Sequence, residues 1–91
     1  MQVPTVMNMK SSRSGKKVKN QFLICTDKGQ YFQSYRSIIA FRDNAGNVTL
    51  DRNRWDYSVT TGKYRNQFLR MNKAETEKAI KAGQIKLEDL N

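Results

Sequence analysis

The chain has 91 residues, of which 37% are apolar, so it can form one domain with a small core and not two. Its 17 Lys and Arg against 8 Asp and Glu give a net charge of +9, and the absence of histidine excludes His-based acid–base switching. A charge of this sign favours polyanions, with nucleic acid first and an anionic membrane or an acidic protein surface after it.

The first nineteen residues are predicted to be a flexible basic arm in front of a single domain over residues 20–91. Met1–Met9 shows no clear period, and it either frays or adds an edge strand through Val3 and Val6. Lys10–Lys19 has five cations, no acid and only Val18 to bury, so it cannot offset its ordering entropy alone. It is either a solvated tail or an arm that orders on a phosphate backbone.

A curved antiparallel meander of three to five strands is predicted next. Asn20–Thr26 has four consecutive apolar residues, which indicates a central strand covered on both faces, with Cys25 buried as a small hydrophobe. Gly29 can adopt positive φ in the following turn, and Gln30–Gln33 returns as the second strand of a hairpin.

The apolar pattern is interrupted at Ser34, where a bulge or corner would let Tyr31 and Ile39 both contribute to the core. A turn over residues 43–47 then leads to a short strand over residues 48–50.

The meander is expected to continue into an alternating segment. Within it Arg52 and Arg54 would lie on one side of an extended chain, and Trp55 and Tyr57 on the other.

Two helices are expected to complete an α+β fold. Tyr64, Phe68 and Met71 recur at helical spacing after three candidate N-cap residues, which are Ser58, Thr60 and Thr61. Asn72 can cap a second helix over residues 73–82, with Gly83 at its C-terminal end. Residues 84–90 are either a last edge strand or an extended tail.

The residue types needed for common enzyme chemistry are missing. Without histidine and with one cysteine, neither the usual metal sites nor a Ser/His or Cys/His pair can form, so we expect no metal, no cofactor and no catalysis. Asp56 is better explained by an ion pair with Arg54 or Arg65 than as a general base. Thr60–Lys63 lacks the full phosphate-loop spacing, which excludes NTP hydrolysis.

The cations are concentrated in the first part of the chain, since residues 1–70 hold 13 basic and 4 acidic side chains while residues 71–91 hold 4 of each. The N-terminus of the first helix, with cations close to it, is a candidate phosphate site. The side chains predicted to contact phosphates are Lys16, Lys17, Lys19, Arg36, Arg52, Arg54, Lys63 and Arg65, and those predicted to stack on unpaired bases are Tyr35, Tyr57 and Tyr64.

Several stretches of the chain resemble a family of small proteins encoded by tailed phages. They read YFQSY at residues 31–35, IIA at 38–40, WDYS at 55–58 and TTGKYRNQFL at 60–69. The resemblance implies a viral accessory protein. A further similarity is to the small basic toxin-inhibiting factors of T4-like phages, which counter a type III toxin–antitoxin system by binding RNA together with the toxin nuclease. No residue of that activity maps onto this chain.

The first functional hypothesis is therefore a non-catalytic inhibitor of a host defence factor, such as a toxin nuclease, that binds RNA or another nucleic acid. The alternative is an inhibitor that docks its basic face on an acidic or nucleic-acid-receiving surface of a host protein, without nucleic acid. No apolar run approaches the roughly 20 residues of a spanning helix, so we expect a protein of the infected cell's cytoplasm with no membrane partner.

Overall fold

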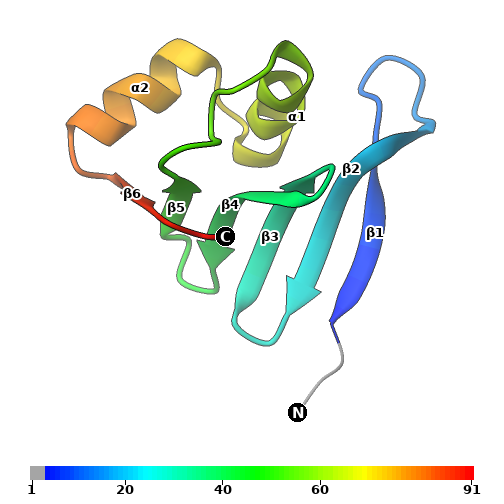
Figure 1. Cartoon of the computed structure of the whole chain (residues 1–91), viewed down its shortest axis with the longest axis horizontal. Coiled ribbons are helices and arrows are strands. Elements are labelled where there is room, and N and C mark those ends of the chain that lie inside the picture. The colour runs from blue at the N-terminus through cyan, green and yellow to red at the C-terminus, as the bar shows by residue number, and fades with distance from the viewer. Residues whose placement is uncertain (1–3) are drawn as a thin grey trace.

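The computed structural model describes residues 4–91 of the chain and has α+β architecture (Figure 1). Six strands form one sheet in the order β1-β2-β3-β4-β5-β6, in which the first five are antiparallel neighbours and β6 runs parallel to β5. The fold class is confirmed, but the sheet has more strands than the three to five predicted. The elements are β1 (Thr5–Lys10), β2 (Lys17–Thr26), β3 (Gly29–Ser34), β4 (Ser37–Asp43), β5 (Val48–Asp51), α1 (Val59–Leu69), α2 (Lys73–Lys81) and β6 (Ile85–Glu88).

Part of the segment expected to be a flexible arm belongs to the sheet. β1 pairs with β2, with Asn8 opposite Phe22, and the Asn8 side chain donates to the Val18 carbonyl at 3.0 Å. Met9 is buried in the core. The β1–β2 pairing explains the difference from the prediction, because it gives the backbone of a polar, cationic segment a partner that its composition does not reveal. β1 confirms at Val6 the edge-strand alternative for residues 1–9, and Val3 lies outside the described residues.

β2 is an inner strand, as predicted, but only one of its faces is covered. Both helices lie on the same side of the sheet (Figure 1). On that side Gln21 is fully buried, whereas Phe22 and Ile24 point to the other side and are half-buried. The expectation of cover on both faces is therefore wrong, and Cys25 is half-buried instead of buried.

The β3–β4 hairpin has its irregularity on the second strand. Phe32 is opposite Ala40 and Gln33 is opposite Ile38, so Ile39 is the extra residue of a bulge. The corner predicted near Ser34 is the hairpin turn, in which Tyr35 has φ of 55°. Ile39 is fully buried as expected, while Tyr31 is half-buried on the uncovered face.

Gly29 begins β3 with φ of 149°, which confirms the predicted positive φ in this turn. A Cβ at this position would lie 2.2 Å from the Arg42 carbonyl oxygen, so only glycine allows β3 and β4 to pair this closely.

The extended segment predicted after β5 is a series of turns instead. The backbone N–H of Trp55 donates to the Asp51 carbonyl at 3.0 Å, and that of Asn53 donates to the Asp51 carboxylate at 3.2 Å. Local hydrogen bonds to an aspartate compete with strand pairing and fold the backbone back on itself. The predicted alternation of Arg52 and Arg54 against the aromatic residues is therefore absent.

Both helices are capped by residues that the sequence identified. The Ser58 hydroxyl accepts from the Thr61 N–H, and Asn72 forms a capping box with Glu75. The first helix ends at Leu69, two residues before Met71, and its C-cap Arg70 has a left-handed backbone conformation.

The helices cover a core between themselves and the sheet. Its buried apolar residues are Met9, Phe32, Ile39, Ala40, Leu50, Tyr64, Phe68, Leu69, Ala79 and Ile85. β6 confirms the edge-strand alternative for residues 84–90 and places Ile85 beside Val48 in this core.

Candidate nucleic-acid interface

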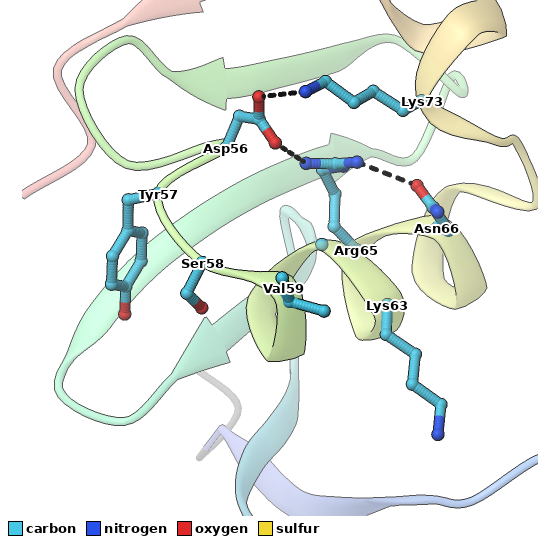
Figure 2. Close-up of a pocket in the computed structure, with 9 residues that line it drawn as sticks. Asp56, Tyr57, Ser58, Val59, Lys63, Arg65, Asn66 and Lys73 are labelled. Atoms are coloured by element: carbon cyan, nitrogen blue, oxygen red, sulfur yellow. Dashed lines mark hydrogen bonds and ion pairs between the residues drawn. The ribbon is translucent and has the colours of Figure 1, made fainter.

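A buried arginine joins the start of α1 to the loop before it. Arg65 has 1% of its surface exposed, and its Nη1 donates to the Trp55 carbonyl at 2.7 Å and to the Asp56 carboxylate at 3.3 Å. Lys73, at the start of α2, contacts the other carboxylate oxygen at 2.8 Å (Figure 2). This confirms the Arg65 alternative of the predicted Asp56 ion pair, whereas Arg54 pairs with Asp51, and it makes Asp56 a bridge between two helices.

These contacts keep Asp56 ionised. The hydrogen bond from Lys73 is the main reason that the pKa of Asp56 lies below its ordinary value; burial opposes the shift and the hydrogen bond from Arg65 reinforces it. The same contact with Asp56 raises the pKa of Lys73. A carboxylate already shared by two cations is poorly suited to act as a general base.

The loop between β1 and β2 lies against α1. Gln67 Nε2 donates to the Lys10 carbonyl at 2.8 Å, across 57 residues of sequence. Ser12 of this loop then lines a hollow of about 380 Å³ together with Lys63 and Arg70 from α1 and its C-cap. The basic segment and the first helix therefore contribute to one surface.

A second, larger hollow of about 560 Å³ adjoins the first and shares Lys63 and Asn66 with it. It opens beside the start of α1, where Tyr57 and Val59 form part of its wall. Figure 2 shows the Lys63 side chain extending away from the carboxylate of Asp56, and Lys63 lines both hollows. An anion in either hollow would meet this amine.

The exposed cations of the β1–β2 hairpin and α1 form what we call the basic surface. The ion pairs found within residues 4–91 involve only Arg52, Arg54, Arg65 and Lys73 among the cations. The basic surface has none of these, and its positive charge is not neutralised by a neighbouring carboxylate. Its members are Lys10, Arg13, Lys16, Lys17, Lys19, Lys63 and Arg70, all of them exposed.

Of the predicted phosphate contacts, Lys16, Lys17 and Lys19 lie on the hairpin, whose loop packs against α1, and Lys63 lies on α1. Arg52 and Arg54 lie apart from them in the turns after β5, paired with Asp89 and Asp51. The predicted phosphate site at the start of α1 therefore keeps Lys63 but loses these two arginines.

The aromatic residues predicted to contact bases likewise divide into buried and exposed ones. Tyr64 is 5% exposed and belongs to the core, so it cannot stack on a base, and the buried Arg65 beside it is not accessible to phosphate. Tyr57 remains exposed next to the larger hollow. Tyr35 and Arg36 are exposed in the β3–β4 turn, where the Tyr35 N–H donates to the Asn20 carbonyl at 2.6 Å.

Sequence reasoning missed Lys10, Arg13 and Arg70 as candidates. Lys10 and Arg13 belong to the same cationic run as the lysines that were chosen, so the run as a whole was the signal. Arg70 could not be found this way, because its proximity to Ser12 arises only when the hairpin packs on α1.

Within the described part of the chain no three Cys, Asp or Glu residues are grouped as metal ligands would be. None of the helices formed by residues 4–91 is both long and apolar enough to cross a membrane.

Comparison with known proteins identifies a family without a described activity. The model of a family of unknown function (DUF8033) matches residues 4–84, most of the chain, so the protein belongs to this family. The curated proteins and the solved structures contain no match to it.

Proposed function

We propose that this member of the DUF8033 family is a non-catalytic RNA-binding protein, and that it inhibits a host defence factor such as the toxin nuclease of a type III toxin–antitoxin system. The observation that carries the proposal is the basic surface, to which the hairpin and the adjacent helix contribute exposed cations that form no ion pair within residues 4–91. Unpaired cations on adjacent elements favour a polyanion, because its binding releases the counterions of several phosphates at once.

The shape of the surface supports the same reading. Two adjoining hollows provide a concave path along α1, with Lys63 between them. Only Asp56 and Glu75 contribute carboxylates to the walls of these hollows, and Asp56 is already paired with Arg65 and Lys73. A phosphate backbone following this path would meet positive charge along most of its length.

The inhibitory role is supported by the resemblance of residues 31–40 and 55–69 to small phage proteins and by the similarity to toxin-inhibiting factors. A basic protein that binds the RNA of an RNA–nuclease complex would hold the nuclease in that complex and keep it from other substrates.

Binding is tested by fluorescence anisotropy with a labelled single-stranded RNA over a series of NaCl concentrations. For about five phosphate contacts the logarithm of the association constant falls with the logarithm of salt concentration with a slope of about −3.5. Replacing Lys16, Lys17 and Lys19 together by Gln moves that slope about 2 closer to zero, since three contacts are lost.

The matched control is Lys78→Gln with Lys81→Gln, which removes two exposed cations from the last turn of α2. This pair changes the net charge without touching the basic surface, so the slope stays at its wild-type value. Equal effects of the two sets, or no retention of RNA at low salt, would refute the proposal.

Inhibition is tested by adding the protein to a type III toxin nuclease with its antitoxin RNA and following cleavage of a reporter RNA. The wild-type chain slows cleavage and the Lys16, Lys17 and Lys19 triple variant does not. Complexes with the nuclease that survive complete removal of RNA would favour the alternative, in which the basic surface docks directly on the protein.

A further inference from the structure

We propose that the uncovered face of the sheet is a stacking platform for unpaired bases, so that the ligand is single-stranded nucleic acid and not a duplex. This inference rests on the proposed function and adds to it the class of nucleic acid and a second contact surface. It begins from the placement of the helices, which cover only one side of the sheet (Figure 1).

A continuous row of side chains crosses the uncovered face. The strand registers join Val6 to Ile24, Ile24 to Tyr31, Tyr31 to Phe41, Phe41 to Thr49 and Thr49 to Lys86, one residue from each of the six strands. Paired residues on neighbouring strands project from the same face, so these side chains stand side by side. The row is apolar or aromatic over its first four strands and ends in a lysine.

The aromatic residues of this face are not part of the hydrophobic core. Tyr31, Phe41 and the neighbouring Phe22 are half-buried, and none of them packs against the core cluster. The rings of Tyr31 and Phe41 lie with their centroids 4.5 Å apart at an interplanar angle of 34°. Val6, at the start of the row, is 59% exposed. Apolar and aromatic side chains that form one contiguous patch, unlike scattered ones, mark an interaction site.

Charge decides which ligand fits this face. Val18 packs against the core, so alternation along β2 puts Lys17 and Lys19 on the uncovered side, at the end beyond Phe22. Lys86 lies at the opposite edge of the sheet. Phosphates of a strand whose bases lie on the rings would therefore meet lysines at both ends.

Among the strand residues that the structure describes, the carboxylates on this side lie beyond the aromatic rows, at Asp43, Glu88 and the buried Asp51. Asp43 is occupied by hydrogen bonds from the N–H groups of Ala45 and Asn47 at 2.9 Å. A second copy of the chain is a poorer occupant than nucleic acid, because it would bring another charge of +9 against the same lysines.

Stacking explains why the strand must be unpaired. Each base has a π-face that an exposed aromatic ring can cover, and a base contributes this face only when it is free of its own neighbours in a duplex. The sheet therefore supplies contacts that do not depend on salt, beside the salt-dependent contacts of the basic surface.

The test compares a single-stranded RNA with a duplex of the same sequence by fluorescence anisotropy at one salt concentration. The wild-type chain binds the single strand at least about tenfold more tightly, given that stacking of one base contributes on the order of one to three kcal/mol. The fluorescence of 2-aminopurine in the single strand is quenched on binding. Equal affinity for strand and duplex would overturn the inference, and so would the absence of quenching.

The variants are Tyr31→Leu and Phe41→Leu, which keep apolar surface but remove the π-faces. The double variant loses the preference for the single strand and the 2-aminopurine quenching, while its salt slope stays at the wild-type value. Lys78→Gln with Lys81→Gln, the pair in the last turn of α2, keeps both properties. Quenching and preference retained in the double variant would overturn the inference.

Two further outcomes separate this inference from the proposed function. Salt-dependent binding that is equal for strand and duplex leaves the proposed function standing and overturns the platform. A stable dimer by sedimentation that is lost in the Leu variants also overturns it, since a second copy would then cover this face. No binding of any RNA overturns both.

Discussion

The two ends of the sheet differ in whether their charged side chains have partners. At the β5–β6 end, Asp51 and Asp56 are each held by several donors, and the ion pairs of the described chain link this end to the starts of α1 and α2. At the β1–β2 end, the exposed cations form no ion pair within residues 4–91, and the buried side-chain amide of Gln21 has no hydrogen-bond partner there. Charges that are satisfied contribute to the fold, and charges left free are available to a ligand.

Asp51→Ala is the change at the β5–β6 end with the largest expected effect on stability. The carboxylate is 1% exposed and accepts from the Leu90 N–H at 2.8 Å and from the Asn91 side chain at 3.1 Å, which ties the C-terminus to β5. Removing this buried acceptor breaks several partly buried hydrogen bonds at once, so the free energy of unfolding should fall by about 3 kcal/mol. Urea denaturation measures this.

Asp89→Ala is the matched control, because its ion pair with Arg52 is exposed on both sides. Its loss should change the free energy of unfolding by less than about 1 kcal/mol. Equal losses in the two variants would show that the β5 end is not stabilised by its buried carboxylate.

Acid should weaken the same end by a smaller amount. Burial raises the pKa of Asp51, but the hydrogen bonds from Leu90, Asn91 and Asn53 outweigh it and the net shift is downward. The pKa of Asp56 is lowered as well. A lowered folded-state pKa means that the unfolded chain binds protons first, so this stabilisation is present above pH of about 4 and is lost as pH falls through the folded-state values.

Urea midpoints between pH 7 and pH 2 measure the acid effect. Asp51→Asn should flatten the profile, because its side chain no longer titrates. A profile that is as steep in this variant as in the wild type would assign the acid sensitivity to other carboxylates.

Gln21→Leu tests the opposite end and should be stabilising. The Gln21 side chain is fully buried on β2, and neither its amide nitrogen nor its amide oxygen has a hydrogen-bond partner among residues 4–91. Replacing an unpaired polar group by an apolar one of similar size removes its desolvation cost, so the free energy of unfolding should rise by about 1 kcal/mol. Thermal unfolding measures it.

Ser34→Ala is the control for Gln21→Leu, since the Ser34 hydroxyl is buried beside it in the sheet but has a partner, the Thr61 hydroxyl at 2.8 Å. This variant should be destabilised. A destabilised Gln21→Leu would mean that an ordered water satisfies the amide.

The contacts of the β5–β6 end were easier to predict from the sequence than those of the β1–β2 end. Ser58 and Asn72 are helix caps that bond to residues within four positions, and the Asp56–Arg65 ion pair spans nine positions. Local sequence patterns were therefore enough to predict these contacts. The turns after Asp51 were missed because their stabilising acceptor also serves the C-terminus, which no local pattern reveals.

The β1–β2 end was harder to predict, because its features depend on the pairing of strands that are far apart in the sequence. The hairpin exists through the register between β1 and β2, and the row on the uncovered face exists only when six strands are aligned. Four half-buried apolar residues in β2 were predicted to be covered on both sides, because composition does not distinguish a sheet face that is covered by helices from one that is left uncovered.

The smallest effect on stability is expected from the basic surface itself. Replacing Lys16, Lys17 and Lys19 by Gln should change the free energy of unfolding by less than about 0.5 kcal/mol per residue, because these exposed side chains have no ion pair to lose. The same triple variant should lose most of its salt-dependent RNA binding. Unfolding in urea and anisotropy on the same preparation measure both. A large loss of stability would mean that these lysines hold the hairpin against the domain, and the contrast between the two ends would then fail.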